Sequence, residues 1–355
     1  MDSSNLNPTT TEASYRNSRI SNGVSKFALE LNAPALLQFH KQSPNLKIIT
    51  SSHPSFPTLN TYFHLDLQPQ PLAICRPQNE QEVADIVRFA ISANIPFTVR
   101  AGGHDSWGRS GVTDALTIDM RELDEIVLAN DKKSVKIGGG TISGNLTKFL
   151  EPHGLVAVQG GCHSVGYANW AACGGYGSMN GSFGLGCDQI LGARIVTPEG
   201  EVVDADEELL WGLRGGGCNF GVVTGMDIKV YSLPKILAGL IAFPIAEAKK
   251  VLLGYDELLN RDFPEAFGGL MGIMVIPGLG TVLLMMFTWS SKDLEAGTKY
   301  VEKIRSLGKV VMDTVSESKP SFFCHSFLAL LTGLQGTDTM TRSYLASMDR
   351  SWQGI

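Results

Sequence analysis

The chain has 355 residues, of which 43% are hydrophobic and 18% charged, and its formal net charge is −6. This composition excludes a disordered or strongly charged protein, and the acidic balance excludes a general nucleic-acid surface. Glycine is enriched, with 39 residues against an average of about 7%. Residues 100–225 hold 26 of these glycines without a triplet period, which excludes collagen. Such clustering indicates backbone in tight turns or in close approach to a ligand.

The N-terminal segment and the cysteines indicate the compartment. Residues 1–26 are polar and have no apolar core, so we expect no secretory signal and a cytoplasmic protein. The six cysteines form no CxxC pair, which argues against a structural zinc site. We therefore expect no metal and mostly reduced thiols. The cysteines occupy positions 75, 162, 173, 187, 218 and 324.

Hydrophobic periodicity predicts the elements of the first two thirds of the chain. Residues 1–60 are expected to be a leader with a weak helix near 26–40. Helices are then predicted over 79–94 and 143–150. Strands are predicted over 71–75, 96–100, 116–119, 126–128, 134–137, 190–196 and 222–230.

The pattern changes near residues 233–236, where the glycines thin out. A strand over 237–243, helices over 247–260 and 294–307 and a strand over 309–315 indicate a second, smaller antiparallel sheet with helices. Residues 268–289 carry no charge, but the Pro277-Gly278-Leu279-Gly280 turn splits them into strand lengths. We expect a buried hairpin there rather than a membrane span. The fold class is therefore α+β, with domains over 66–236 and 237–355.

Two other classes of enzyme have weaker support. Residues 138–144 follow a strand and precede a helix, as a Rossmann phosphate loop does. Their spacing is GxGxxxG, and no acidic residue follows at the expected distance, so a nicotinamide fold is disfavoured. Ser164 does not lie in a GxSxG motif, and neighbours such as Cys162 and His163 point apart on an extended chain. A hydrolase is therefore disfavoured too.

Three glycine clusters carry the chemistry. They cover residues 100–110, 160–177 and 209–224, and each lies at a predicted strand end. Backbone N–H groups exposed by glycine turns form concavities that bind anions. Several such turns suit a long anionic ligand, and a dinucleotide fits this description.

In these three clusters the chain resembles the FAD-linked oxidases related to vanillyl alcohol oxidase and p-cresol methylhydroxylase (PCMH), in the berberine-bridge-enzyme-like branch. The RAGGH segment ending at His104, the GGCHSVG segment around Cys162, the CGGYG segment ending at Gly177, FGLGCD at 183–188 and the LWGLRGGG–NFGVVT stretch at 210–224 match family motifs. The resemblance covers about residues 66–236. It implies a PCMH-type FAD-binding domain of two subdomains followed by a substrate domain.

The resemblance also implies the cofactor and its ligands. In the family, the histidine is bonded to the flavin 8α-methyl group, and in bicovalent members the cysteine is bonded to C6. FAD attached through both His104 and Cys162 is therefore expected. By this correspondence the residues expected to bind FAD are Arg100, Ala101, Gly102, Gly103, His104, Asp105, Gly161, Cys162, Val165, Gly166, Gly174, Gly175, Gly177, Gly221 and Val222.

The chain departs from the family pattern in three places. Residues 167–170 read YANW where the family commonly has VGGH after its VG, and Cys173 stands where the family has a glycine. Family members also continue into a segment that returns to the flavin domain and often supplies a catalytic tyrosine. This sequence stops at Ile355, before such a return, so a partial substrate domain is expected.

The implied activity is oxidation of a small organic molecule, an alcohol or an activated C–H or C–N group, with hydride transfer to flavin N5. Dioxygen is the expected acceptor, giving hydrogen peroxide, because Val165 occupies the family's oxygen-gating position. Biosynthesis of a secondary metabolite is the expected setting, with no nucleic-acid or membrane partner. A non-catalytic FAD-binding relic and a Rossmann-type NAD enzyme are the alternatives. The catalytic base is not assigned, because Tyr255, Asp256, Glu257 and Tyr300 lie on predicted helices where solvated faces are expected.

Overall fold

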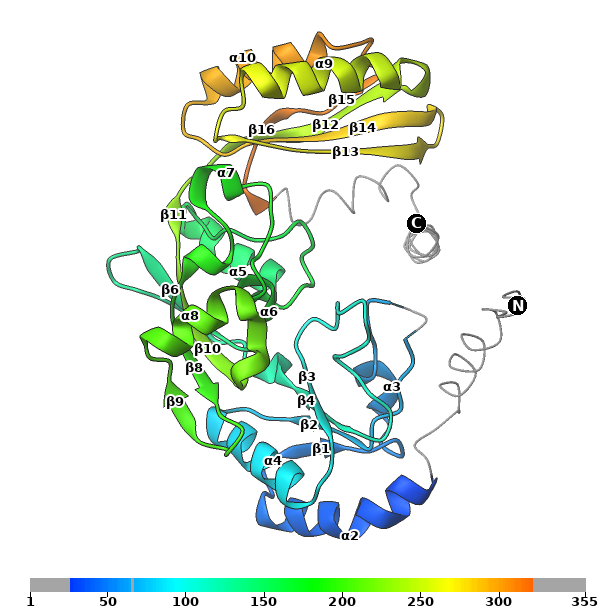
Figure 1. The fold of residues 1–355 in the computed structure, drawn as a ribbon, viewed down its shortest axis with the longest axis vertical. Helices are drawn as coiled ribbons and strands as arrows, with labels where there is room; N and C mark the ends of the chain where they lie inside the picture. Colours follow the sequence, from blue (N-terminus) through cyan, green and yellow to red (C-terminus); the bar gives the residue numbers. More distant parts are fainter. Residues whose placement is uncertain (1–25, 65–66, 322–355) are drawn as a thin grey trace, which may run out of the picture.

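The computed structural model describes residues 26–64 and 67–321. Three larger sheets follow one another along the long axis of the molecule in chain order, and helices lie beside each of them (Figure 1). Strands β7 (Leu155–Val156) and β11 (Tyr231–Ser232) form a separate two-stranded antiparallel sheet. The fold is α+β, as expected, and the second sheet is antiparallel, so the Rossmann alternative is wrong.

The first sheet has the strand order β1-β2-β4-β3, in which β2, β4 and β3 run parallel and β1 is antiparallel. Its helix α4 begins after Asn79, whose side chain accepts a hydrogen bond from the Glu82 N–H and so caps the helix. The elements are α2 (Lys26–Gln42), β1 (Lys47–Ile49), α3 (Phe56–Leu59), β2 (Ala73–Arg76), α4 (Glu80–Ser92), β3 (Phe97–Arg100), β4 (Leu116–Asp119) and the short η1 (Met120–Glu122).

The helix expected near 26–40 is confirmed by α2, but the described part of residues 1–60 packs on the first sheet and is not a separate leader. Strand β1 extends the first sheet, and Phe39 of α2 stacks on Phe89 of α4 with ring centroids 4.2 Å apart. Leu46 and Phe56 are buried in the same region. A three-residue strand shows no periodicity, so only its tertiary partners identify it. Residues 1–25 lie outside the described part.

The second sheet has the strand order β5-β6-β10-β8-β9, and its core is shared with α5, α6 and α8. Helix α4 touches both sheets, and Val196 and Val222 of the second sheet join the core of the first. The elements are β5 (Ile126–Leu128), β6 (Ser134–Gly138), α5 (Ser143–Leu150), η2 (Glu151–His153), β7 (Leu155–Val156), α6 (Tyr167–Ala172), α7 (Asn180–Phe183), η3 (Cys187–Gln189), β8 (Ile190–Val196), β9 (Val202–Asp204), α8 (Glu207–Gly216), η4 (Gly217–Phe220), β10 (Val222–Lys229) and β11 (Tyr231–Ser232).

The glycine turn after β6 serves packing. A Cβ atom on Gly139 would lie 2.1 Å from the Val223 carbonyl oxygen, and one on Gly140 would lie 1.8 Å from the Met120 carbonyl oxygen. Protein backbone therefore fills the space that a phosphate takes in a Rossmann loop.

The third sheet has the strand order β13-β14-β12-β15, and β16 also pairs with β12. Helices α9 and α10 cover the face turned away from the rest of the molecule (Figure 1). The elements are β12 (Ile236–Pro244), η5 (Ile245–Glu247), α9 (Ala248–Arg261), β13 (Phe267–Ile276), β14 (Gly280–Trp289), α10 (Leu294–Arg305), β15 (Met312–Asp313) and β16 (Ser316–Ser318).

The hairpin predicted over 268–289 is confirmed, because β13 pairs antiparallel with β14 from Phe267↔Trp289 to Ile276↔Gly280. The expectation that it is buried holds for most of β14 but is wrong for β13, where Leu270, Ile273 and Val275 are exposed. Within the described residues, no helix is long and apolar enough to span a membrane. The strand predicted over 309–315 is shorter than expected, since only Met312 and Asp313 pair with β12 before β16 begins.

A buried carboxylate joins the strands of the first sheet. Asp119, at the end of β4, is fully buried and lies 2.9 Å from Arg100 Nη2 and 2.7 Å from Arg121 Nη2. Arg76 Nε approaches the same oxygen at 3.5 Å. Burial alone would raise the pKa of Asp119, but the hydrogen bond from Arg121 and the charges of Arg100 and Arg121 outweigh it and hold the pKa below its usual value.

Replacing Asp119 by Asn is expected to lower the free energy of unfolding by about 3–5 kcal/mol, because the buried Arg100 guanidinium loses its counter-charge. Urea denaturation measures this change. Asp85→Asn is the control, since Asp85 pairs with Arg88 at the surface, and its cost should stay below about 1 kcal/mol. Equal costs for the two variants would contradict the role assigned to Asp119.

The same carboxylate predicts a pH dependence. Because its folded pKa is depressed, its contribution to stability is complete above the unfolded pKa of about 3.9 and is lost as the pH falls through the folded value. Denaturation curves of the D119N variant should show a weaker loss of stability with acid than those of the parent protein.

Candidate functional site

Two turns that are distant in the sequence meet at the centre of the site. The first turn (residues 100–104) follows β3, and the second turn (residues 162–166) precedes α6. A Cβ atom on Gly102 would lie 2.1 Å from the Ser164 carbonyl oxygen and 2.7 Å from the Gly166 nitrogen. Only glycine permits this approach, so the turns are in direct backbone contact.

The base of the first turn is held by charge. The Arg100 side chain is 1% exposed, pairs with Asp119 and lies over the Tyr62 ring at 5.0 Å from its centroid. Asp105, just after the turn, accepts hydrogen bonds from the Arg109 backbone N–H at 2.5 Å and from its guanidinium at 2.6 Å. Both predicted cofactor residues therefore have protein partners.

His104 is placed by a stack and a hydrogen bond. Its ring stacks on Phe63, with centroids 4.1 Å apart and an interplanar angle of 25°. Its Nε2 lies 2.7 Å from the Ser164 hydroxyl oxygen. Burial, with smaller effects of His64 and His163, lowers the pKa of His104 to about 4, so the imidazole is neutral at physiological pH.

Cys162 reaches the same hydroxyl from the second turn. Its Sγ lies 3.6 Å from Ser164 Oγ, and its carbonyl oxygen accepts the Val165 N–H at 3.4 Å, which closes the turn. Val165 is half-buried, and its carbonyl oxygen accepts the Ser143 N–H at 3.0 Å. All five cysteines in the described ranges are free thiols, while Cys324 lies outside those ranges.

The remaining predicted glycines shape the surrounding loops. Gly175 has φ +73° and packs against Gly186, and Gly177 packs against the Gln159 carbonyl oxygen. Gly174, with φ +106°, faces open space. Of the other predicted residues, Ala101 and Gly103 lie within the first turn and Gly161 directly precedes the second turn. Gly221 directly precedes β10, and Val222 is its first residue.

The residues that depart from the family motif have partners within the protein. Tyr167 is fully buried, and its hydroxyl donates to the Val158 carbonyl oxygen at 2.9 Å. Trp170 packs against Gly160, Gly175 and Gly186. Cys173 is exposed, and its thiol lies 3.5 Å from Asn169 Oδ1. The extra bulk of residues 167 and 170 is therefore absorbed by the protein interior.

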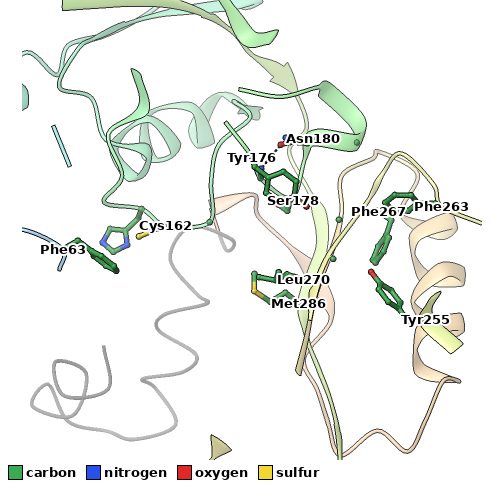
Figure 2. A pocket seen from close by; sticks show the side chains of 16 residues that line it. Phe63, Cys162, Tyr176, Ser178, Asn180, Tyr255, Phe263, Phe267, Leu270 and Met286 are labelled. Atoms are coloured by element: carbon green, nitrogen blue, oxygen red, sulfur yellow. Dashed lines mark hydrogen bonds between the residues drawn. The ribbon is translucent and has the colours of Figure 1, made fainter. Parts of the chain in front are cut away.

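A cavity of about 690 Å³ extends from Cys162 to the third sheet (Figure 2). Phe63 and Cys162 lie on one side, and Leu270 and Met286 of the hairpin lie on another (Figure 2). The lining has no Asp, Glu, Lys or Arg side chain among the described residues. It consists of Phe63, Gly161, Cys162, His163, Tyr176, Gly177, Ser178, Asn180, Gly181, Tyr255, Phe263, Phe267, Gly268, Gly269, Leu270 and Met286.

The start of β13 brings the third sheet against the glycine loops. A Cβ atom on Gly268 would lie 2.1 Å from the Ser178 carbonyl oxygen, and the Ser182 hydroxyl donates to the Ser290 carbonyl oxygen at 3.0 Å. Gly269 leaves room for the Tyr255 hydroxyl, because a Cβ atom at position 269 would lie only 3.0 Å from that oxygen. Tyr255 on α9 therefore reaches the cavity past a strand that carries no side chain at this point.

This placement corrects two expectations about the helices. Asp256 and Glu257 are exposed, as expected, but Tyr255 is half-buried at the cavity. Tyr300 is 2% exposed and donates to the Asp262 carbonyl oxygen at 2.9 Å, so it belongs to the core. His325 lies outside the described residues. Sequence reasoning also missed Phe63 and the bridging role of Ser164, which depend on contacts between distant segments.

The comparisons with known proteins agree with this geometry. Residues 71–206 match the family model of an FAD binding domain. FAD-linked oxidoreductase aurO of Gibberella zeae is 40% identical over 287 residues, which are 80% of this chain and 57% of that protein. (R)-6-hydroxynicotine oxidase of Paenarthrobacter nicotinovorans is 32% identical over 264 residues, 70% of this chain and 55% of that protein. The chain thus spans little more than half the length of these relatives.

Solved structures share the fold. 6-Hydroxy-D-nicotine oxidase from Arthrobacter nicotinovorans superposes with a TM-score of 0.75 at 28% identity, covering 82% of this chain and 64% of that one. A BBE-like protein from Arabidopsis thaliana superposes with a TM-score of 0.71 at 21% identity, covering 85% of this chain and 62% of that one. These findings define an FAD-binding protein with the fold of the PCMH-type and BBE-like oxidases. The chain belongs to the FAD-linked oxidoreductases.

Replacing Gly102 by Val is expected to abolish flavin binding, because the side chain would separate the two turns. The ratio of flavin to protein absorbance after purification measures the loss. Gly272→Ala is the control, since a Cβ atom on Gly272 meets no atom within 4 Å. Normal flavin content in the Gly102 variant would contradict the close contact of the turns.

Proposed function

We propose that the protein is an oxidase whose FAD is attached covalently to both His104 and Cys162. One observation carries the proposal. The side chains of His104 and Cys162 come from two turns that are distant in the sequence, and both lie at the Ser164 hydroxyl beside a large cavity. A neutral imidazole and a thiol are both nucleophiles suited to covalent attachment. His104 Nδ1 has no hydrogen-bond partner among the described residues, which leaves it available to react.

The residues present fit FAD. The glycine turns bring bare backbone to the site, and Gly174 faces space that a side chain would occupy. We assign cofactor contacts to the two turns and to the loops at Gly174 and Gly221. Arg100 and Asp105, which have protein partners, support the first turn.

The cavity supports a small uncharged substrate. Bound FAD would supply the acceptor for a hydride taken from an alcohol or an activated C–H or C–N group. Five aromatic rings and no charged side chain line the cavity among the described residues, so a charged substrate would lose its hydration without gaining a partner. The aromatic walls would hold a planar organic molecule and exclude water around it.

Two phenols can orient such a substrate. Tyr176 and Tyr255 both line the cavity. Burial raises the pKa of Tyr255, and Tyr176 raises it further, so the Tyr255 phenol keeps its proton at physiological pH. It therefore donates a hydrogen bond to the substrate rather than removing a proton from it.

Dioxygen is the proposed acceptor of the electrons, with hydrogen peroxide as product. Val165 follows Ser164 in the second turn and is half-buried, and the family resemblance makes it the residue that leaves room for oxygen. We further propose a cytoplasmic enzyme of secondary-metabolite biosynthesis.

Covalent attachment gives a direct test. The purified protein should be yellow and should keep its flavin after acid denaturation, since two covalent bonds hold it. The H104A and C162A variants should each keep one bond, and the double variant should release all flavin; the flavin in the acid precipitate and the masses of flavin peptides measure this. Cys187→Ala, at another half-buried thiol, should keep both bonds. Complete release from the parent protein would show that attachment is not covalent.

A protein that binds FAD without turnover is the rival function. An uncharged aromatic alcohol should bleach the visible absorbance of oxidised flavin without air, and admitting air should restore the colour and yield hydrogen peroxide. A carboxylate analogue of the same size should be about tenfold less effective, because the described residues that line the cavity include no Lys or Arg. Bound flavin that no such alcohol reduces would favour the non-catalytic function.

A further inference from the structure

Ser164 lies between the two proposed flavin anchors. Its Oγ is 2.7 Å from His104 Nε2 and 3.6 Å from Cys162 Sγ. Over residues 26–64 and 67–321, no other hydrogen bond is formed by either of these two side chains. One hydroxyl therefore connects groups that are 58 residues apart in the sequence.

The position of this hydroxyl is fixed by its backbone. The Ser164 carbonyl oxygen lies against Gly102 of the first turn. The flanking residues are held by the start of α5, because the His163 carbonyl oxygen accepts the Gly144 N–H at 2.8 Å and the Val165 carbonyl oxygen accepts the Ser143 N–H at 3.0 Å. The stack on Phe63 fixes the plane of the His104 ring. The short distance thus belongs to a rigid arrangement.

The chemistry of the three groups sets the direction of the hydrogen bonds. A thiolate only accepts hydrogen bonds, whereas a hydroxyl donates one and accepts others. When Cys162 ionises, the Ser164 O–H turns to the sulfur, and Ser164 Oγ accepts the N–H of His104 Nε2. The neutral imidazole then carries its lone pair on Nδ1. Ionisation of the thiol and the tautomer of the imidazole are therefore linked through one hydroxyl.

We propose that Ser164 is a positioning residue for flavin attachment, which makes His104 Nδ1 nucleophilic when Cys162 is a thiolate. This inference rests on the proposed covalent attachment. Each attachment replaces one hydrogen of the flavin and one hydrogen of the side chain with a C–N or C–S bond. Dioxygen takes up the two hydrogens and their two electrons as hydrogen peroxide, so atoms and electrons balance.

Ser164→Thr and Ser164→Val test the hydroxyl, because these variants have nearly the same shape and only threonine keeps the O–H. Protein produced without flavin is mixed with FAD in air, and the flavin that resists acid is measured over time. The threonine variant should attach flavin within about threefold of the parent rate. The valine variant should attach it about tenfold more slowly than the parent, because it loses a hydrogen bond to a charged group. Equal rates for these two variants would overturn the proposal.

Ser106→Ala is the matched control. Ser106 Oγ lies 3.1 Å from His64 Nε2, so this variant removes a serine–histidine contact from a histidine that is not a proposed anchor. Its rate of attachment should equal that of the parent. If the parent protein itself forms no acid-stable flavin, the proposed function fails; if the parent forms it and the valine variant does so equally fast, only the role of Ser164 fails.

The link between the two anchors is tested in the C162A background, where no thiolate sets the direction of the hydrogen bonds. Replacing Ser164 by Val should slow attachment to His104 by a smaller factor there than in the parent protein. Such a difference is a coupling between the two positions. Equal factors in the two backgrounds would show that Ser164 acts on His104 without Cys162.

Discussion

The backbone contact between the first and second turns determines the site. Gly102 presses against the carbonyl oxygen of Ser164, so the separation of the turns is set by atoms that cannot change rotamer. His104 is the last residue of the first turn and Cys162 is the first residue of the second turn. The Ser164 hydroxyl lies between their side chains. The contact between the two turns therefore brings the side chains of His104 and Cys162 together. The proposed attachment of the cofactor at two points would require this fixed spacing, because attachment geometry tolerates little error.

The buried charges beneath this contact have a second effect. Asp119 gathers guanidinium groups from β2, β3 and the residues after β4, so the strand that feeds the first turn is tied to its neighbours by charge. An apolar cluster of the same size could be as stable, since buried ion pairs are expensive to desolvate. Directional hydrogen bonds, however, hold neighbouring strands in one register, whereas apolar packing also allows the strands to shift slightly along one another. We interpret the network as support for the precise placement of Arg100 at the start of the turn.

Periodicity predicted the longer elements well, because their apolar spacing reflects one buried face. The strand over 116–119 and the helix over 143–150 match the structure at both ends. Helix α8 and strand β1 were missed, because glycines mask the first and three residues carry no period in the second. In the site, the family motifs predicted His104 and Cys162, whose side chains the structure brings to one hydroxyl, whereas the places of Ser164, Phe63 and Tyr255 depend on contacts between distant segments. Tyr300 shows the limit of reasoning from helix faces, since only the tertiary fold tells which side of α10 is covered.

The cavity has two walls of different origin. The wall that carries Cys162 belongs to the glycine-rich loops, while Leu270, Met286 and Tyr255 come from the third sheet and its helix. The two meet through backbone at Gly268, through the hydroxyl of Ser182 and through an apolar cluster in which Met179 packs with Ile236 and Ala238 of β12. Substitutions on β13, β14 or α9 can therefore reshape the wall opposite Cys162 while the anchors stay in place. Under the proposed function, the residues that select a substrate and those that hold the cofactor therefore belong to different parts of the chain, and the first set can change while the second is kept.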